Sequence, residues 1–133
     1  MNRSPQHEFP NMNAKWWIVL AGISGALAVG LGAYGAHGLE GDEVLRRQFD
    51  TANRYHMWHT LALLGTALLT ERGGRWAHAA AGLFTLGMLL FSGALYAATA
   101  AGFWGLTFLA PWGGVALMAG WLALIGAALR RNP

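Results

Sequence analysis

The sequence feature that most limits the possible folds is a run of 20 residues without a charged side chain, from Trp16 to Gly35. A helix of this length, at 1.5 Å per residue, covers about 30 Å, which is the thickness of the hydrocarbon core of a bilayer. Three further uncharged runs follow at residues 55–70, 77–101 and 112–129. An unpaired backbone group in lipid costs several kcal/mol, and no run alternates with a period of two. Each run is therefore predicted to be a transmembrane helix.

The composition also indicates a lipid environment. Hydrophobic residues make up 55% of the 133 residues and charged residues only 11%, against about a quarter charged in soluble domains. A chain this short leaves much of its surface exposed, so it cannot enclose so many apolar side chains in a core of its own. The net charge of +3 gives no reason to expect a nucleic-acid partner, and the absence of Cys excludes disulfides and thiolate sites.

The predicted fold is an all-α integral membrane protein in which four transmembrane helices form a bundle. The bundle is a single domain over residues 15–131, between a polar leader (1–14) and a short tail (132–133). The second run has only 16 residues, so it requires either a backward helical extension or a locally thin bilayer.

Between the first and second runs the pattern becomes amphipathic. Asp42 is predicted to cap a helix in which Val44, Leu45, Phe49 and Ala52 recur at spacings of three and four. This segment is expected either to lie in the membrane interface as a short separate helix or to form the exposed start of the second transmembrane helix.

Orientation is predicted from the Lys and Arg residues on each side. The leader, the 71–76 turn and the tail carry six of them, the first connection carries three, and the third connection carries none. Cytoplasmic segments carry the excess of these residues, so both termini are expected in the cytoplasm.

Small residues repeat every four positions along three of the runs, a pattern that allows close contact between helices in lipid. The predicted packing residues are Gly22, Ala26 and Gly30; Ala28 and Gly32; Gly93 and Ala97; and Ala119 and Ala123. Pro111, Gly113 and Gly114 are expected to start the fourth helix and to allow close packing there. The first helix thus carries two stripes on opposite faces, which is more than one neighbour requires. We expect one of the two stripes to pack against another protein chain.

Four sequence blocks in the same order resemble a known family. They are GAYGAHGL at 32–39, FDTANRYHMWHTLALL at 49–64, LFSGALY at 90–96, and APWGG at 110–114 with GW at 120–121. On these blocks the chain is similar to the family called transmembrane protein 256, or domain of unknown function 423, over nearly its whole length from the first helix onward.

The resemblance implies a four-helix integral membrane protein of the kind found in bacterial inner membranes, with eukaryotic relatives. It implies no reaction, because the biochemical role of the family is not established. The chain departs from the family pattern at His56, where the family usually has Gln, and in its additional leader. A function special to this chain is expected at those departures.

Histidines near the ends of the first two helices are candidate ligands. His37 ends the first run and His59 lies near the start of the second, so both are expected at one membrane face, with His56 one turn before His59. Imidazoles from two helices can bind a metal or a haem iron. The alternative is that they bind carbonyls or carboxylates of the adjoining loop, and no acid lies inside a run to complete a metal site.

Further polar residues are candidates for a ligand site or a polar network. Tyr55 and His59 are four apart and share a helix face, where they can relay protons, bind a quinone head group or tie the amphipathic segment to the bundle. Arg54 is expected to pair with an acid or a lipid phosphate, or to extend to the interface. Ser92 and Tyr96 are expected to hydrogen-bond within the bundle, or else to contact a ligand.

The sequence favours a non-catalytic accessory or structural subunit of a larger membrane complex, or of an assembly of identical chains. It contains no nucleotide-binding, serine-hydrolase or zinc-protease motif, so enzymatic activity is not expected. The alternative is a binding module for a lipid, quinone, haem or metal at the periplasmic end, although only bound lipid is expected. Transport is disfavoured, because no run contains an acidic residue.

Overall fold

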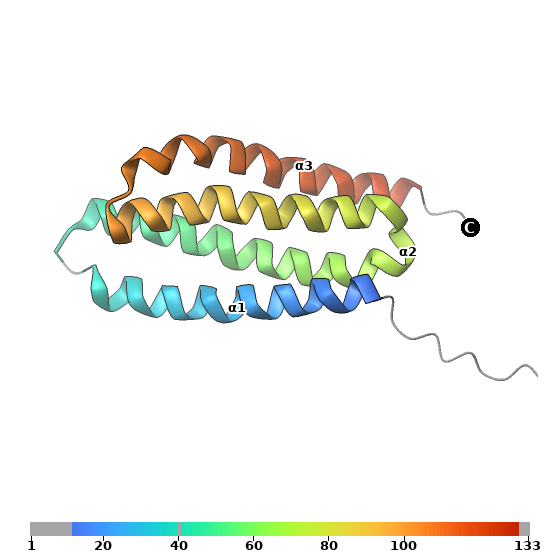
Figure 1. The fold of residues 1–133 in the computed structure, drawn as a ribbon, viewed down its shortest axis with the longest axis horizontal. Helices are drawn as coiled ribbons and strands as arrows, with labels where there is room; N and C mark the ends of the chain where they lie inside the picture. The colour runs from blue at the N-terminus through green and yellow to red at the C-terminus, as the bar shows by residue number, and fades with distance from the viewer. Residues whose placement is uncertain (1–11, 40, 131–133) are drawn as a thin grey trace, which may run out of the picture.

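The computed structural model describes residues 12–39 and 41–130, and within these ranges its secondary-structure elements are all helices (Figure 1). The elements, in order, are α1 (Met12–Gly38), α2 (Glu43–Ala101), the short 3-10 helix η1 (Trp104–Phe108) and α3 (Leu109–Leu129). The all-α prediction is confirmed. Most of the predicted leader (1–11) and the predicted tail (132–133) lie outside the described residues.

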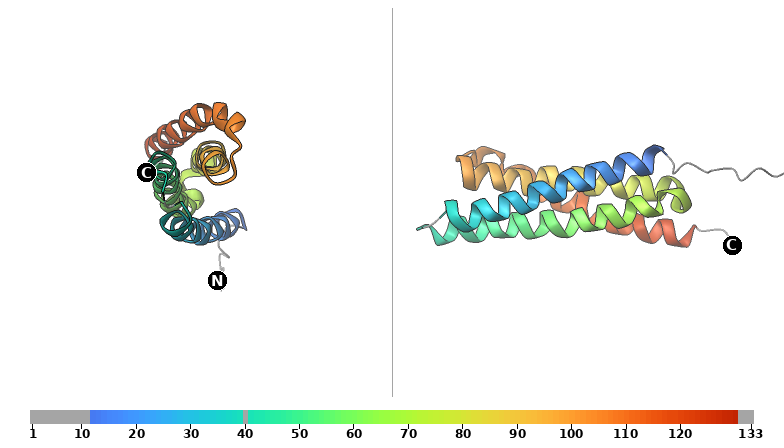
Figure 2. Two further views of the ribbon diagram at one scale, coloured as in Figure 1. Left: turned by 90° about the vertical axis from the view of Figure 1, so that its left-hand side faces the viewer. Right: turned by 90° about the horizontal axis from the view of Figure 1, so that it is seen from below.

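The long helix α2 folds back on itself at Gly74, where φ is 54° and ψ is −143°. Residues with a side chain rarely adopt a positive φ, so a glycine is suited to this reversal. The two arms of α2 lie side by side and run in opposite directions (Figures 1 and 2). We call residues 43–73 the first arm and residues 75–101 the second arm.

Among the described residues, three helical segments are long and apolar enough to cross a membrane: Ala14–Gly38, Gly74–Ala101 and Trp104–Leu129. The first arm of α2, which contains the predicted second transmembrane run at 55–70, is not among them. Its hydrophobic part is interrupted by His56 and His59, and charged residues precede it from Glu43 to Arg54. Of the two alternatives for this short run, the structure shows the backward extension, because the helix continues before residue 55 and begins at Glu43.

Asp42 caps α2 as the sequence predicts. Its side-chain Oδ1 accepts hydrogen bonds from the backbone N–H groups of Val44 and Leu45, both at 3.1 Å. The separate amphipathic helix of the predicted fold is not formed, because the helix that Asp42 starts runs without a break into residues 55–70. The amphipathic segment is therefore the exposed start of α2.

The two arms of α2 form the centre of the molecule. α1 contacts α2, and α3 contacts α2 and η1, but across residues 12–39 and 41–130 α1 and α3 do not contact each other. The end-on view shows the resulting open arrangement (Figure 2). The core lies between the arms and their two neighbours, and its fully enclosed side chains include Leu63, Phe84 and Ala80.

Glycines set the distance between α3 and the second arm. A Cβ on Gly113 would collide with the backbone of Phe91, and one on Gly120 would lie 2.7 Å from the Phe84 ring. Pro111 lies in the first turn of α3, which begins close to where the sequence indicates.

The predicted packing residues fall into three groups. Ala28 and Ala123 are buried, and a Cβ on Gly32 would meet the Asn53 side chain. Gly93, Ala97 and Ala119 are partly buried. The stripe formed by Gly22, Ala26 and Gly30, which we call the Gly22 stripe, is exposed, and neither glycine of the stripe has an atom within 4 Å of its Cβ position.

Candidate functional site

Polar side chains gather on one face of the first arm, halfway along the helices. Asn53, His56 and Thr60 are spaced by three and four residues, so they share that face. His56 Nδ1 lies 2.9 Å from the hydroxyl of Tyr96 on the second arm, and His56 Nε2 lies 2.9 Å from the hydroxyl of Ser24 on α1. One imidazole therefore joins three helical segments.

The hydrogen bonds continue beyond His56 in both directions. Ser24 Oγ lies 2.6 Å from Thr60 Oγ1, and the Thr60 hydroxyl donates to the Met88 sulfur at 3.6 Å. At the other end, Asn53 Nδ2 donates to Tyr96 Oη at 3.1 Å and to the carbonyl oxygen of Ala28 at 2.8 Å. We call the six side chains the polar relay: Asn53, Tyr96, His56, Ser24, Thr60 and Met88.

The relay can hold its protons in two arrangements, because a neutral imidazole donates from one nitrogen and accepts at the other. In the first, Tyr96 donates to His56 Nδ1, His56 Nε2 donates to Ser24, Ser24 donates to Thr60, and Thr60 donates to Met88. In the second, Thr60 donates to Ser24, Ser24 donates to His56 Nε2, and His56 Nδ1 donates to Tyr96. The second arrangement leaves the Tyr96 hydroxyl hydrogen without an acceptor inside the relay.

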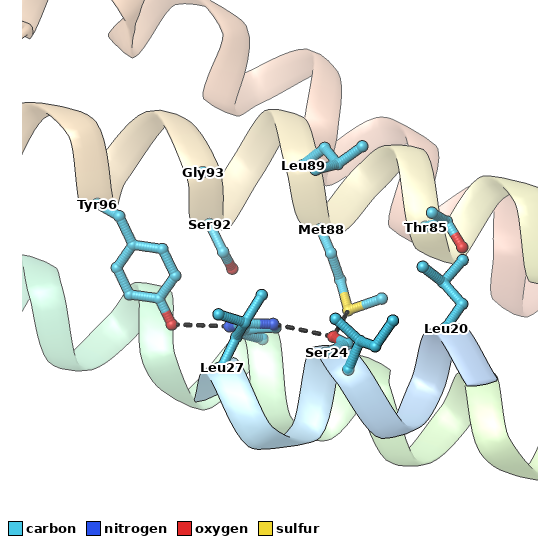
Figure 3. Close-up of a pocket in the computed structure, with 11 residues that line it drawn as sticks. Leu20, Ser24, Leu27, Thr85, Met88, Leu89, Ser92, Gly93 and Tyr96 are labelled. Carbon is cyan, nitrogen blue, oxygen red and sulfur yellow. Dashed lines mark hydrogen bonds between the residues drawn. The ribbon is translucent and has the colours of Figure 1, made fainter. Parts of the chain in front are cut away.

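A groove of about 170 Å³ opens beside the relay, between α1 and the second arm (Figure 3). Ser24, His56, Met88 and Tyr96 line its base. The rest of the lining is mostly apolar, with Leu20, Ile23 and Leu27 on α1 and Leu89 and Gly93 beside Thr85 and Ser92 on the second arm. No Asp, Glu, Lys or Arg is among the described residues that line the groove.

His59 faces the other side of the first arm, toward α3. Trp121 Nε1 donates to His59 Nε2 at 3.1 Å, and the indole N–H can only donate, so Nε2 carries the lone pair. His59 Nδ1 therefore carries the proton, which it donates to the Tyr55 carbonyl oxygen at 2.7 Å. The ring of Tyr55 stacks on His59 with a centroid distance of 5.9 Å. Both His59 nitrogens are engaged within the chain.

The hydrogen bond between Trp121 and His59 is expected to stabilise the contact between α2 and α3. Trp121→Phe keeps an aromatic ring but leaves His59 Nε2 without its donor, so we expect a loss of about 1 kcal/mol in the free energy of unfolding. Unfolding of the detergent-solubilised protein, followed by circular dichroism, measures this loss. Trp112→Phe is the control, since Trp112 is 67% exposed on the same helix. Equal stabilities of the two variants would contradict the prediction.

The remaining candidates are spread along the molecule. His37 is exposed in the last turn of α1. Arg54 is exposed on the first arm. Ser92 donates to the carbonyl oxygen of Ala52 at 2.8 Å and so joins the two arms. Among the described residues no three His, Asp or Glu side chains gather as metal ligands would.

Four members of the relay are not predicted from the sequence: Ser24, Asn53, Thr60 and Met88. The spacing of Asn53, His56 and Thr60 is a usable signal, because it marks one polar face on a helix that is otherwise apolar there. Ser24 is a polar residue inside the first apolar run, which also suggests a partner in the bundle. Met88 has no distinguishing signal, because methionine is common in apolar helices.

The fold and the site together define a class: a small helical membrane protein whose polar side chains are hydrogen-bonded to one another inside the bundle. Residues 31–114 match the family described as "Protein of unknown function (DUF423)". This match covers more than half of the chain, which therefore belongs to that family, and the resemblance seen in the sequence blocks is confirmed.

Relatives of similar length support the membrane assignment. The UPF0382 membrane protein YwdK of Bacillus subtilis is 40% identical over 121 residues, which cover 87% of this chain and 98% of YwdK. The UPF0382 inner membrane protein YgdD of Escherichia coli K12 is 35% identical over 122 residues, covering 90% of this chain and 93% of YgdD. The chain is therefore a membrane protein. No solved structure matches it.

Proposed function

We propose that the chain crosses the inner membrane four times, with both termini in the cytoplasm. Four crossings are supported by the chain direction, because α1 and the second arm run the same way and the first arm returns the chain between them (Figure 1). The first arm has 31 residues, or about 46 Å of helix, enough to span the core and to leave its charged start outside. The start of α1, the reversal at Gly74 and the end of α3 lie at one end of the molecule (Figure 1), and Lys15, Arg72 and Arg75 belong to the first two of these segments.

Within that membrane the protein acts as a non-catalytic accessory subunit that packs against another membrane protein through α1. The observation that carries this proposal is the exposed Gly22 stripe. Helices in lipid gain little from the hydrophobic effect and associate through close packing at small residues. The opposite face of α1, with Ala28 and Gly32, packs against α2 within the chain. The Gly22 stripe has the same spacing and no neighbour within the described residues.

Single-cysteine cross-linking tests this proposal directly, because the chain contains no Cys of its own. Ala26→Cys, introduced in native membranes and treated with a short bifunctional thiol- and amine-reactive reagent, is expected to give one defined adduct larger than the monomer. The adduct's mass identifies a different protein or a second copy. Gly65→Cys is the control, because Gly65 is exposed on the first arm, away from α1. Only uncross-linked chain from Ala26→Cys would overturn the proposal.

Filling the stripe is expected to separate the complex without unfolding the chain. Ala26→Leu places a larger side chain where close packing needs a small one, and we expect at least a tenfold loss of the partner that co-purifies in mild detergent. Ala26 is exposed within the chain, so the melting temperature should not change. Gly65→Leu is the matched control and should retain the partner. Native mass spectrometry measures both variants, and full retention by Ala26→Leu would contradict the proposal.

A further inference from the structure

We propose that the groove between α1 and the second arm binds the ring of an uncharged, lipid-soluble quinone. The α1 residues that line the groove, Leu20, Ile23, Ser24 and Leu27, are not those of the Gly22 stripe, and the inference does not require the accessory role. It concerns binding alone and assigns no electron transfer to the protein.

The size of the groove fits a single ring. Its volume is about 170 Å³, and an apolar protein cavity of about 150 Å³ is known to hold benzene. Leu27 and Leu89 line the groove and are 55% and 67% exposed, so the groove is open toward lipid. A ring inside the groove can therefore leave its apolar tail in the membrane.

The chemistry of the relay fits a head group that changes between hydrogen-bond acceptor and donor. In the second proton arrangement the Tyr96 hydroxyl hydrogen has no acceptor in the relay, so it is available to a quinone carbonyl in the groove. In the first arrangement Tyr96 Oη accepts from Asn53 and donates to His56, which leaves a lone pair for a hydroquinone hydroxyl. One imidazole thus adapts the site to either form.

The lack of charged side chains in the lining argues against a phospholipid headgroup as the ligand. A phosphate at this depth would need Arg, Lys or several backbone donors, and the described lining residues include no cation. Ser24 lies halfway along α1, well inside the apolar span, where an uncharged ring costs little to bury. A diacylglycerol is also uncharged and is therefore the competing ligand in the test.

The experiment uses the full-length protein in phosphatidylcholine nanodiscs with decyl-substituted benzoquinone as the probe, and native mass spectrometry measures occupancy. We expect saturable binding of one quinone per chain and at least tenfold weaker binding of dioleoylglycerol. Equal binding of dioleoylglycerol, or no saturable quinone binding, would overturn the proposal.

Gly93→Leu tests the location of the site without removing a hydrogen bond. Gly93 lines the groove and has open space at its Cβ position, so leucine there fills the groove while the chain stays folded. We expect occupancy to fall at least tenfold. Gly82→Leu is the matched control, since Gly82 lies on the same arm, also has open space and is not part of the lining. Undiminished binding in Gly93→Leu would place the quinone elsewhere and overturn the proposal.

The relay provides a second readout, which does not depend on affinity. Nitrogen-15 spectra of labelled histidine distinguish an imidazole protonated at Nδ1 from one protonated at Nε2. Without ligand we expect His56 to carry its proton on Nε2, because that arrangement gives every relay hydrogen an acceptor. Quinone is expected to move the proton to Nδ1, and hydroquinone to return it to Nε2. In Tyr96→Phe this response should disappear, whereas Tyr55→Phe, away from the groove, should keep it. No quinone response in the unmodified protein would overturn the proposal.

Discussion

Gly113→Ala is expected to lower the free energy of unfolding by about 3 kcal/mol, at the upper end of what overpacking by one methyl group costs. The added Cβ would lie 2.8 Å from the Leu90 carbonyl carbon and would collide with the backbone nitrogen of Phe91. Both atoms belong to the main chain of the second arm, so no side chain can rotate away. The helices α2 and α3 must then separate along their whole contact.

Gly114→Ala is a closely matched control. Its added Cβ would lie 4.0 Å from the Phe91 ring, which is an ordinary contact, so its stability should stay within about 0.5 kcal/mol of the unmodified protein. Unfolding of purified protein in mixed micelles with rising dodecyl sulfate, followed by circular dichroism, compares the two variants. Similar stabilities for these neighbouring substitutions would show that Gly113 does not lie against the main chain of the second arm.

Phe84→Ala is expected to lower the free energy of unfolding by an amount comparable to Gly113→Ala. The reason is the opposite one, because the substitution creates a cavity instead of overpacking. Phe84 is fully buried, and its ring contacts those of His59 and Trp121 at centroid distances of 5.7 and 5.1 Å. Truncation of a buried phenylalanine costs about 3 kcal/mol or more, because the surrounding helices close the space only in part. The same micelle unfolding assay measures the loss.

Combining Phe84→Ala with Gly120→Ala tests directly whether the two residues are in contact. Alone, Gly120→Ala forces a Cβ to within 2.7 Å of the Phe84 ring and should cost about 1 to 3 kcal/mol. In the Phe84→Ala background the ring is gone, so the same substitution should cost close to nothing. The double variant is thus expected to be about as stable as Phe84→Ala alone. Additive losses would show that the two residues do not touch.

Much of the fold follows from patterns that lipid imposes on a sequence. The helical runs, the cap at Asp42 and the turn near residues 71–76 are local features, each set by charge, hydrogen bonding or glycine within a few residues. The first arm is harder to classify because His56 and His59 reduce its hydrophobicity, although the chain gives both of them partners. Whether it spans the membrane depends on its neighbours, which a local pattern does not contain.

The sequence predicts only two of the six members of the polar relay, because the relay residues come from three helical segments. His56 and Tyr96 stand out as polar residues in apolar surroundings, but their bond to each other depends on how the two arms align. His56 and His59 are three apart and yet face different neighbours, α1 and α3 respectively. The distribution of small residues on α1 showed two packing faces, but not which of them α2 would occupy.

The open arrangement around α2 determines which elements border the groove. Within the described residues α1 contacts α2 and no other element, whereas α3 contacts α2 and η1. The width of the groove beside Leu27 is therefore set by the packing of α1 on α2, and the close contact of α3 at Gly113 and Gly120 does not border it. α1 thus borders both the groove and the Gly22 stripe, so a protein that packs against the stripe would contact the same helix that closes one side of the groove.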